Sequence, residues 1–292
     1  MKRFAIILVA ILALPSVRAG EPGMKQTIAY VQKLQTESGG FWPQAPNSNA
    51  IKIAPTLRAT SAAMRALRYF GGEVPNKDAC VKFVASCHDP KSGGFSDTPG
   101  GKPDVFSTAV GLMAVTELKM PTEKYADGAS KYLTENAKTF EDIRIASAGF
   151  EAIKKTPAKQ EEWRNNVLKL QNKDATFGKG PGMARDTGGS VVTVLRLGGK
   201  TSDRCVKVLK AGQRQNGGYG KADSDSASDL ETTYRVMRCF VMLKARPDNV
   251  EGVRSFVAKC RNADGGYGVA PGQPSSVGGT YFAAIITHWL KQ

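Results

Sequence analysis

Most residues whose type and position suggest chemistry are carboxylates at the starts of helix-like segments. Asp229 and Glu231 open the segment DLETTYRVMRCFVML, while Asp104 and Asp186 precede VFSTAV and TGGSVV. A carboxylate at such a position can hold a metal or move a proton, and it can also cap a helix by accepting backbone N–H bonds. Residues 228–231, SDLE, fit the capping box S-x-x-E. Capping is therefore the favoured interpretation for all three aspartates, with Asp229 in the first turn.

Basic and aromatic residues near the same segments are the next candidates. Arg58 and Arg185 are the only basic residues that the sequence places near helix starts, where they could meet an anionic head group. Surface exposure is the alternative for both. Four aromatic residues on these segments could line a central cavity, although ordinary core packing is the favoured role: Phe106, Tyr234, Tyr281 and Phe282.

Cysteine and histidine usage limits the metal chemistry of the chain. Only His88 and His288 are present, and no CxxC pair occurs, which excludes histidine-rich zinc sites. An odd number of cysteines in an exported protein leaves at least one unpaired or bonded to another molecule. We interpret the five mainly as small buried apolar residues: Cys80, Cys87, Cys205, Cys239 and Cys260.

The first nineteen residues resemble a signal peptide. Lys2 and Arg3 precede an apolar stretch over 4–15, and residues 17–19, VRA, form a small-x-small cleavage site. The stretch is too short for a spanning helix, which needs about 20 residues. We expect export to the periplasm or the exterior, with an uncleaved membrane anchor as the alternative.

The charge of the chain favours anionic partners. The formal net charge is +15, and only Lys2, Arg3 and Arg18 belong to the leader. An anionic membrane surface or a diphosphate would be attracted to such a protein, although a solvated basic surface is the favoured interpretation. The basic residues are scattered and no nucleic-acid motif occurs, so nucleic acid is not an expected partner.

The segments that must position these residues form an internal repeat. SGGFW at 38–42, SGGFSDTPG at 92–100, NGGYGKA at 216–222 and DGGYGVAPG at 264–272 share one pattern, and QNKDATFGKGPG at 171–182 is a weaker copy. A degenerate unit lies at 132–153, so six units result. In each unit an amphipathic helical stretch ends at the glycines, a polar loop follows, and a second, more apolar helix begins.

This repeated pattern predicts an all-α protein, an α/α toroid of about six helical hairpins. The second helices are apolar on most faces and should form a buried inner ring, whereas the first helices have a polar side and should form an outer ring. No alternating strand pattern appears. A closed ring needs no polar end caps, unlike an open solenoid. We expect one such domain over residues 20–292.

The repeats resemble those of the protein prenyltransferase β-subunit and terpenoid cyclase superfamily. GGFSDTPGGKPDVFSTAVGLMAV at 93–115 is similar to a β-subunit repeat, nearest the type II geranylgeranyltransferase kind, and GPGMARDTGGSVVTV at 180–194 is similar to that family's PGM-x-x-H-GG segment. The resemblance implies a central apolar cavity for an isoprenoid, an active site at the rim, a catalytic zinc ion and a helical α-subunit as partner.

The zinc ligands of that family are poorly matched. Its Asp-x-Cys falls on residues 229–231, so only Asp229 agrees and Glu231 replaces the cysteine. Its two histidine positions fall near Gly279 and on Asp186 or Thr187. The basic residues that hold diphosphate fall on 223 and 226, which are Asp and Ser. A zinc cofactor is thus implied by resemblance alone.

Three functions stay open from the sequence. The first is a prenyltransferase β-subunit-like protein that binds an isoprenoid or similar lipid, with geranylgeranyl-type transfer implied by resemblance. The second is a non-catalytic, exported binding or scaffold toroid that lacks the zinc site. The third is a divergent terpenoid cyclase, for which residues 223–226, DSDS, are the nearest match to the Asp-x-Asp-Asp acid. The sequence leaves open whether the protein is an enzyme.

Overall fold

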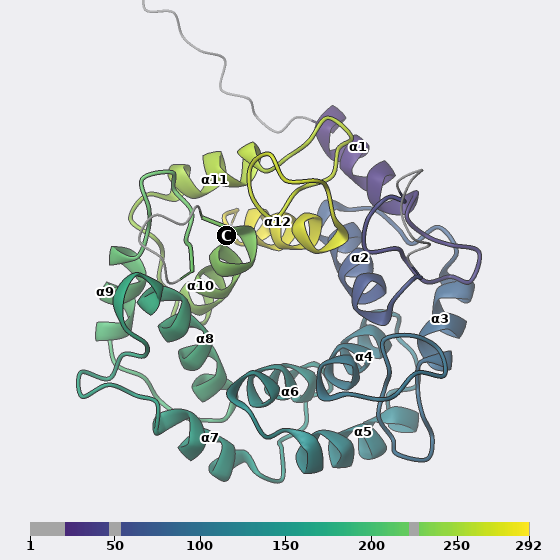
Figure 1. Cartoon of the computed structure of the whole chain (residues 1–292), viewed down its shortest axis with the longest axis horizontal. Coiled ribbons are helices and arrows are strands. Elements are labelled where there is room, and N and C mark those ends of the chain that lie inside the picture. The colour runs from purple at the N-terminus through teal and green to yellow at the C-terminus, as the bar shows by residue number, and fades with distance from the viewer. Residues whose placement is uncertain (1–20, 47–53, 222–227, 292) are drawn as a thin grey trace, which may run out of the picture.

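The computed structural model describes residues 21–46, 54–221 and 228–291, and these form two concentric rings of helices (Figure 1). The leader and the DSDS stretch, both singled out from the sequence, lie outside the described residues. The inner ring consists of α2 (Leu57–Phe70), α4 (Val105–Glu117), α6 (Phe140–Ala152), α8 (Met183–Arg196), α10 (Leu230–Met242) and α12 (Val277–Trp289). The outer ring consists of α1 (Glu21–Gln32), α3 (Lys77–Ser86), α5 (Glu123–Asn136), α7 (Gln160–Leu168), α9 (Arg204–Ala211) and α11 (Val250–Lys259).

The inner ring is closed. Each inner helix packs against the next one, and α12 packs against α2, so the last unit meets the first (Figure 1). The described residues contain isolated β-bridges but no named strand. Among those residues no helix has both the length and the apolar character needed to cross a bilayer. The predicted α/α toroid is therefore confirmed.

The first glycine of each strong repeat is required by backbone shape and by space. Gly39, Gly93, Gly217 and Gly265 have φ values of 88°, 76°, 89° and 89°, a conformation that favours glycine. A Cβ on Gly217 would lie 2.0 Å from the carbonyl oxygen of Gly252 in α11. A Cβ on the first glycine of the other three turns would clash in the same way with the backbone of α3, α5 and α1. The glycines thus join each unit to the outer helix of the next.

The aromatic residue after the glycines fastens each turn to an inner helix. The backbone N–H of Tyr219 donates to Thr233 Oγ1 (3.1 Å), and that hydroxyl donates to the carbonyl oxygen of Asp229 (2.7 Å). The same pair of bonds recurs at Phe41 with Thr60, Phe95 with Thr108, and Tyr267 with Thr280. Phe41, Phe95 and Tyr219 are buried, so these side chains also pack the turns into the core.

The weaker units depart from this design in ways that explain their weak sequence signal. Ala175 occupies the left-handed position with φ 67°, where the strong repeats have glycine. Its turn still fastens to α8, because the backbone N–H of Phe177 donates to Thr187 Oγ1 (3.0 Å). The α5–α6 unit uses instead a capping box, in which Thr139 and Asp142 exchange hydrogen bonds at the start of α6.

All five cysteines are buried and free, as their interpretation as small apolar residues predicts. Cys80 illustrates the environment, since its thiol donates to Met64 Sδ at 3.5 Å. Burial raises the pKa of Cys80 to about 12, so the thiol stays protonated near neutral pH.

Candidate functional site

The N-terminal ends of the inner helices form one rim of the ring, and three of the predicted site residues meet there. The Arg58 guanidinium pairs with Asp97 (3.6 Å) and Asp104 (3.3 Å) and lies over the ring of Phe106 at 4.6 Å. Asp104 is also the N-cap of α4, since its Oδ1 accepts the backbone N–H of Ser107 (2.7 Å). Arg58, Asp104 and Phe106 are thus a mutually engaged group, and Phe106 lies at the rim rather than deep in the ring.

Asp229 is the N-cap of α10. Its Oδ1 accepts the backbone N–H of Thr232 (2.7 Å) and its Oδ2 accepts the Thr232 hydroxyl (2.8 Å). The predicted capping box was wrong in register by one residue: Ser228 donates to Asn216 Oδ1 (2.7 Å), and Glu231 pairs with Arg235 (2.9 Å). The turn sets this register, because its bonds to Thr233 and Asp229 fix where α10 begins.

Asp186 does not cap a helix, contrary to the sequence interpretation. A short 3-10 turn at Gly180–Gly182 leads directly into α8, which therefore begins at Met183 and places Asp186 within its first turn. The carboxylate pairs with the neighbouring Arg185 at 3.4 Å. An acidic group there still favours the helix, because the N-terminal end carries partial positive charge.

Three of the four predicted lining residues come together in the middle of the ring. The ring centroid of Tyr234 lies 5.9 Å from that of Tyr281 and 5.1 Å from that of Phe282. The same tyrosine stacks on Trp289 at 5.6 Å with nearly parallel rings, 16° apart. The sequence interpretation did not single out Trp289.

Arg65 faces these aromatic rings and forms no ion pair with any residue that the structure describes. Its guanidinium lies 4.1 Å from the centroid of Tyr281, and one N–H contacts Met113 Sδ at 3.5 Å. The Nε of Arg65 is buried and has no hydrogen-bond partner among the described residues. The nearby carboxylate of Glu117 forms an ion pair with Arg68 instead (3.1 Å). An unpaired buried donor of this kind is costly unless something binds it.

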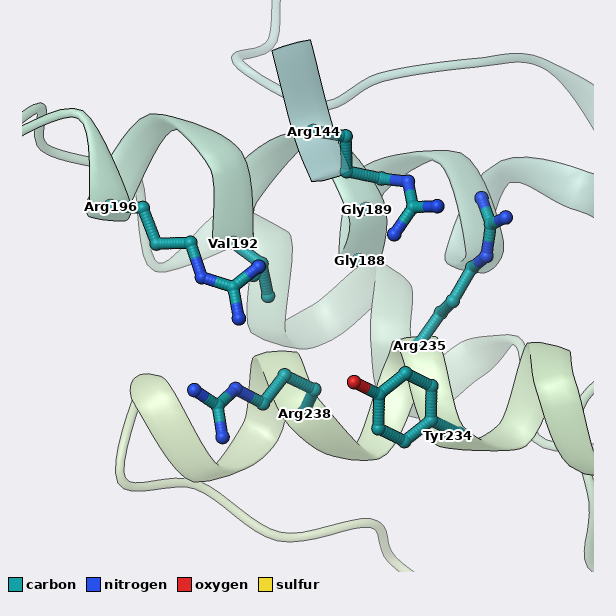
Figure 2. Close-up of a pocket in the computed structure, with 8 residues that line it drawn as sticks. All are labelled: Arg144, Gly188, Gly189, Val192, Arg196, Tyr234, Arg235 and Arg238. Carbon is teal, nitrogen blue, oxygen red and sulfur yellow. The ribbon is translucent and has the colours of Figure 1, made fainter. Parts of the chain in front are cut away.

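Four further arginines converge on a small pocket between α6, α8 and α10, with Tyr234 at its edge (Figure 2). Its volume is about 20 Å³, and Gly188, Gly189 and Val192 complete its wall. Gly188 allows the close approach of α8 to α10, since a Cβ there would lie 3.3 Å from the backbone of the residues at 235 and 236. The four are Arg144, Arg196, Arg235 and Arg238.

Glutamates on α6 and α10 neutralise part of this charge. Glu151 pairs with both Arg196 (2.8 Å) and Arg238 (3.0 Å), while Glu141 pairs with Arg144 (2.8 Å) and Arg235 (2.9 Å). Burial would raise the pKa of Glu141, but the two arginines lower it further, so the carboxylate stays ionised. Together with Glu231, three carboxylates pair with these four arginines, and a positive excess remains.

The excess positive charge lowers the pKa of Tyr234. Burial would raise the pKa of its phenol, yet Arg65, Arg196 and Arg238 together lower it below its ordinary value. We call this set of residues the central cluster: Arg65, Arg144, Arg196, Arg235, Arg238, Tyr234 and Tyr281. Its positive potential suits an anion, and its tyrosines and the neighbouring Phe282 and Trp289 offer apolar faces.

The central lining is only partly apolar among the described residues, because arginines lie beside the aromatic rings. Arg58 and Arg185 were also not the only basic residues placed for an anionic group. The missed signal was charge inside an apolar segment: Arg235 and Arg238 interrupt the inner helix α10. The sequence could not show that these side chains point inward, since α10 is otherwise apolar on most faces.

The described residues do not fit the zinc site that the resemblance implies. No group of three or more His, Cys, Asp or Glu is placed to hold a metal among them. Both oxygens of Asp229 are engaged by Thr232. Cys260, whose pKa its burial and the charge of Asp229 raise to about 12, donates its thiol proton to the carbonyl of Phe256.

Comparison with known proteins agrees with the ring of hairpins. A family model described as the prenyltransferase alpha-alpha toroid domain matches residues 60–141 and 131–292. The chain belongs to this family. No curated protein matches its sequence.

Solved structures match the fold along nearly the whole chain. The type II terpene cyclase MstE from Scytonema matches at 10% identity with a TM-score of 0.61, covering 92% of this chain and 96% of that one. A variant of the same cyclase, in complex with its substrate geranylgeranyl dihydroxybenzoate, matches at 11% identity with a TM-score of 0.60 and the same coverage. A glycosidase matches at 12% identity, with a TM-score of 0.62 and 92% and 96% coverage. At these identities the likeness shows the shared toroid alone.

Proposed function

We propose that this toroid binds an isoprenoid with an anionic head group, and that the head group pairs with Arg65 in the central cluster. The observation that carries the proposal is the guanidinium of Arg65, whose Nε is buried and which has aromatic and thioether neighbours but no ion pair within the described part of the chain. A diphosphate or carboxylate would satisfy its free donors by charge-assisted hydrogen bonds. The family membership and the isoprenoid substrate of the terpene cyclase relative support the choice of ligand.

The aromatic part of the centre would hold the isoprenoid chain. Tyr234, Tyr281 and Phe282 present adjoining rings beside Arg65, and prenyl chains pack well on such faces. The pocket between the four arginines has an open volume of about 20 Å³, so a prenyl chain would lie on these rings and not inside that pocket.

Binding, rather than zinc-dependent transfer, is the activity proposed. The described residues offer no set of zinc ligands, and the aspartate that matches the family motif is occupied as a helix cap. Neither zinc nor an α-subunit forms part of the proposal. Export, expected from residues 1–19, would place the protein away from cytosolic thiol acceptors and is consistent with a binding role.

Isothermal titration of the purified chain with geranylgeranyl diphosphate and with neutral geranylgeraniol tests this proposal. We expect the diphosphate to bind more tightly, and Arg65→Gln to weaken its binding by about tenfold or more, because hydrogen bonds to charged groups contribute about 1.5–3 kcal/mol. Arg68→Gln is the matched control, since it lies on the same helix with a 55% exposed side chain. Chelation of metal should change nothing.

Four outcomes would overturn the proposal. Equal affinity for the alcohol and the diphosphate would remove the role of the head group. An unchanged affinity in Arg65→Gln would remove the role of this arginine. Turnover that requires added zinc would favour the transferase hypothesis, and cyclised product without a partner subunit would favour the cyclase.

A further inference from the structure

A second pocket lies at the face of the ring opposite the rim, where inner helices end. It is formed by the C-terminal half of α10, the loop that follows it, the start of α11 and the end of α12, and its volume is about 330 Å³. Small-molecule sites span about 300–1,000 Å³. The wall is mostly apolar, and it includes Met237, Phe240, Val241, Pro247, Val250 and Trp289.

Two cations line this apolar pocket. Lys244 and Arg246 belong to the pocket and are exposed, and no ion pair is found for either among the described residues. Asp248, the acidic residue nearest to them in the chain, pairs with Lys210 at 2.6 Å. Lys244 has a left-handed backbone with φ 52° directly after the helix end. An apolar hollow with two unpaired cations has the chemistry of a site for an anionic amphiphile.

The pocket is separate from the central cluster. Trp289 lines it and stacks on Tyr234, so this indole stands between the two spaces. Arg238 also lies over the indole, with its guanidinium 5.8 Å from the ring centroid. A chain bound in the second pocket would therefore contact Trp289 without reaching Arg65, which packs on Tyr281.

We propose that this pocket binds a single-chain anionic amphiphile of the fatty-acid class, with the alkyl chain in the hollow and the carboxylate between Lys244 and Arg246. The size of the hollow favours one chain. Two exposed cations match one carboxylate, whereas a broad bilayer surface would not need a hollow. This ligand is additional to the isoprenoid of the central cluster, and the two proposals are independent of each other.

Titration of the purified chain with octanoate, decanoate and dodecanoate tests the alkyl part, followed by calorimetry and by tryptophan fluorescence. Each added methylene should tighten binding by about fourfold until the hollow is full, as expected for its transfer from water. The double variant Lys244→Asn, Arg246→Gln should weaken decanoate by about fivefold, because exposed ion pairs are individually modest. Neutral decanol should bind both proteins alike.

Lys119→Asn is the matched control. Lys119 follows α4 with a left-handed backbone at φ 57°, as Lys244 follows α10, but it does not line the pocket. Asparagine tolerates this conformation, so both variants should fold. Decanoate affinity should be unchanged in Lys119→Asn and in Arg65→Gln, which distinguishes this site from the central one.

Any of the following results overturns the proposal. These are no binding of the carboxylates, no dependence on chain length, equal affinity for decanol and decanoate, or an undiminished affinity in the double variant. Binding to phosphatidylglycerol vesicles without binding to decanoate would likewise overturn it and assign the face to a membrane surface. Loss of decanoate binding in Arg65→Gln would move the ligand to the central cluster.

Discussion

Replacing Asp229 tests whether its carboxylate only caps α10 or also takes part in chemistry. In the structure its two oxygens accept the backbone N–H and the hydroxyl of Thr232, at 2.7 and 2.8 Å, and Thr232 is fully buried. Asp229→Ala would leave both donors of Thr232 without this acceptor. Asp229→Asn would retain an oxygen for the N–H, and its amide could donate to the hydroxyl, so the cap survives without its charge.

The magnitude follows from these contacts. Loss of an N-cap costs about 1 kcal/mol, and an unsatisfied buried donor adds about 1 kcal/mol or more, so the alanine variant should lose about 2 kcal/mol. The asparagine variant should lose only the attraction of a negative charge for the helix end, about 0.5 kcal/mol. In a chain of this size, 1 kcal/mol shifts the melting temperature by about 2–4 °C.

Urea unfolding followed by circular dichroism measures both differences, and isoprenoid titration of the same variants measures function. Asp104 provides a parallel test, because it caps α4 with the same pair of bonds to Ser107. If Asp229→Asn destabilised the chain as much as alanine did, the cap would not be the source of stability. If the asparagine variant kept its stability but lost bound zinc, the role of Asp229 would be chemical.

Two further predictions concern the repeat and the buried thiols. Ala175→Gly should stabilise the chain by up to about 1 kcal/mol, because it relieves a left-handed alanine at φ 67° in exchange for some backbone entropy; a decrease in urea midpoint would contradict this. Burial raises the pKa of Cys80, Cys87 and Cys260 to about 12, so between about pH 8.5 and 12 the folded state holds more protons than the unfolded state. The free energy of unfolding should therefore fall as pH rises through this window, by at most about 1.4 kcal/mol per unit for each thiol. Cys80→Ala should make that slope shallower, and an unchanged slope would refute the assignment.

Much of the fold could be predicted because its information is local. A glycine pair after an amphipathic stretch stops one helix, and an acid or hydroxyl residue before an apolar stretch starts the next. Thr56, Asp104, Asp229 and Ser276 are all such caps in the structure. The starting residue of α10 was less certain than the presence of the helix, because SDLE has two residues able to cap it. Only the bonds from the glycine turn select Asp229.

The candidate site could be predicted only in part. Tyr234, Tyr281 and Phe282 were chosen as aromatic residues on inner helices, and they meet in the structure. The arginines were missed because a helix that is apolar on most faces gives no clue to which polar residue points inward. Arg235 of α10 reaches Glu141 of α6 past α8, an arrangement that the close approach at Gly188 permits.

The sequence by itself determined the helical hairpins, their number and their order, since hydrophobic periodicity and turn residues act over a few neighbouring positions. Only the tertiary structure decided what fills the middle of the ring. Arg65 and Tyr281 belong to the first and last inner helices, and they meet because α12 closes against α2. Such a contact depends on the curvature of the whole ring. This curvature is the sum of small angles between successive helices, so no single segment of the sequence determines it.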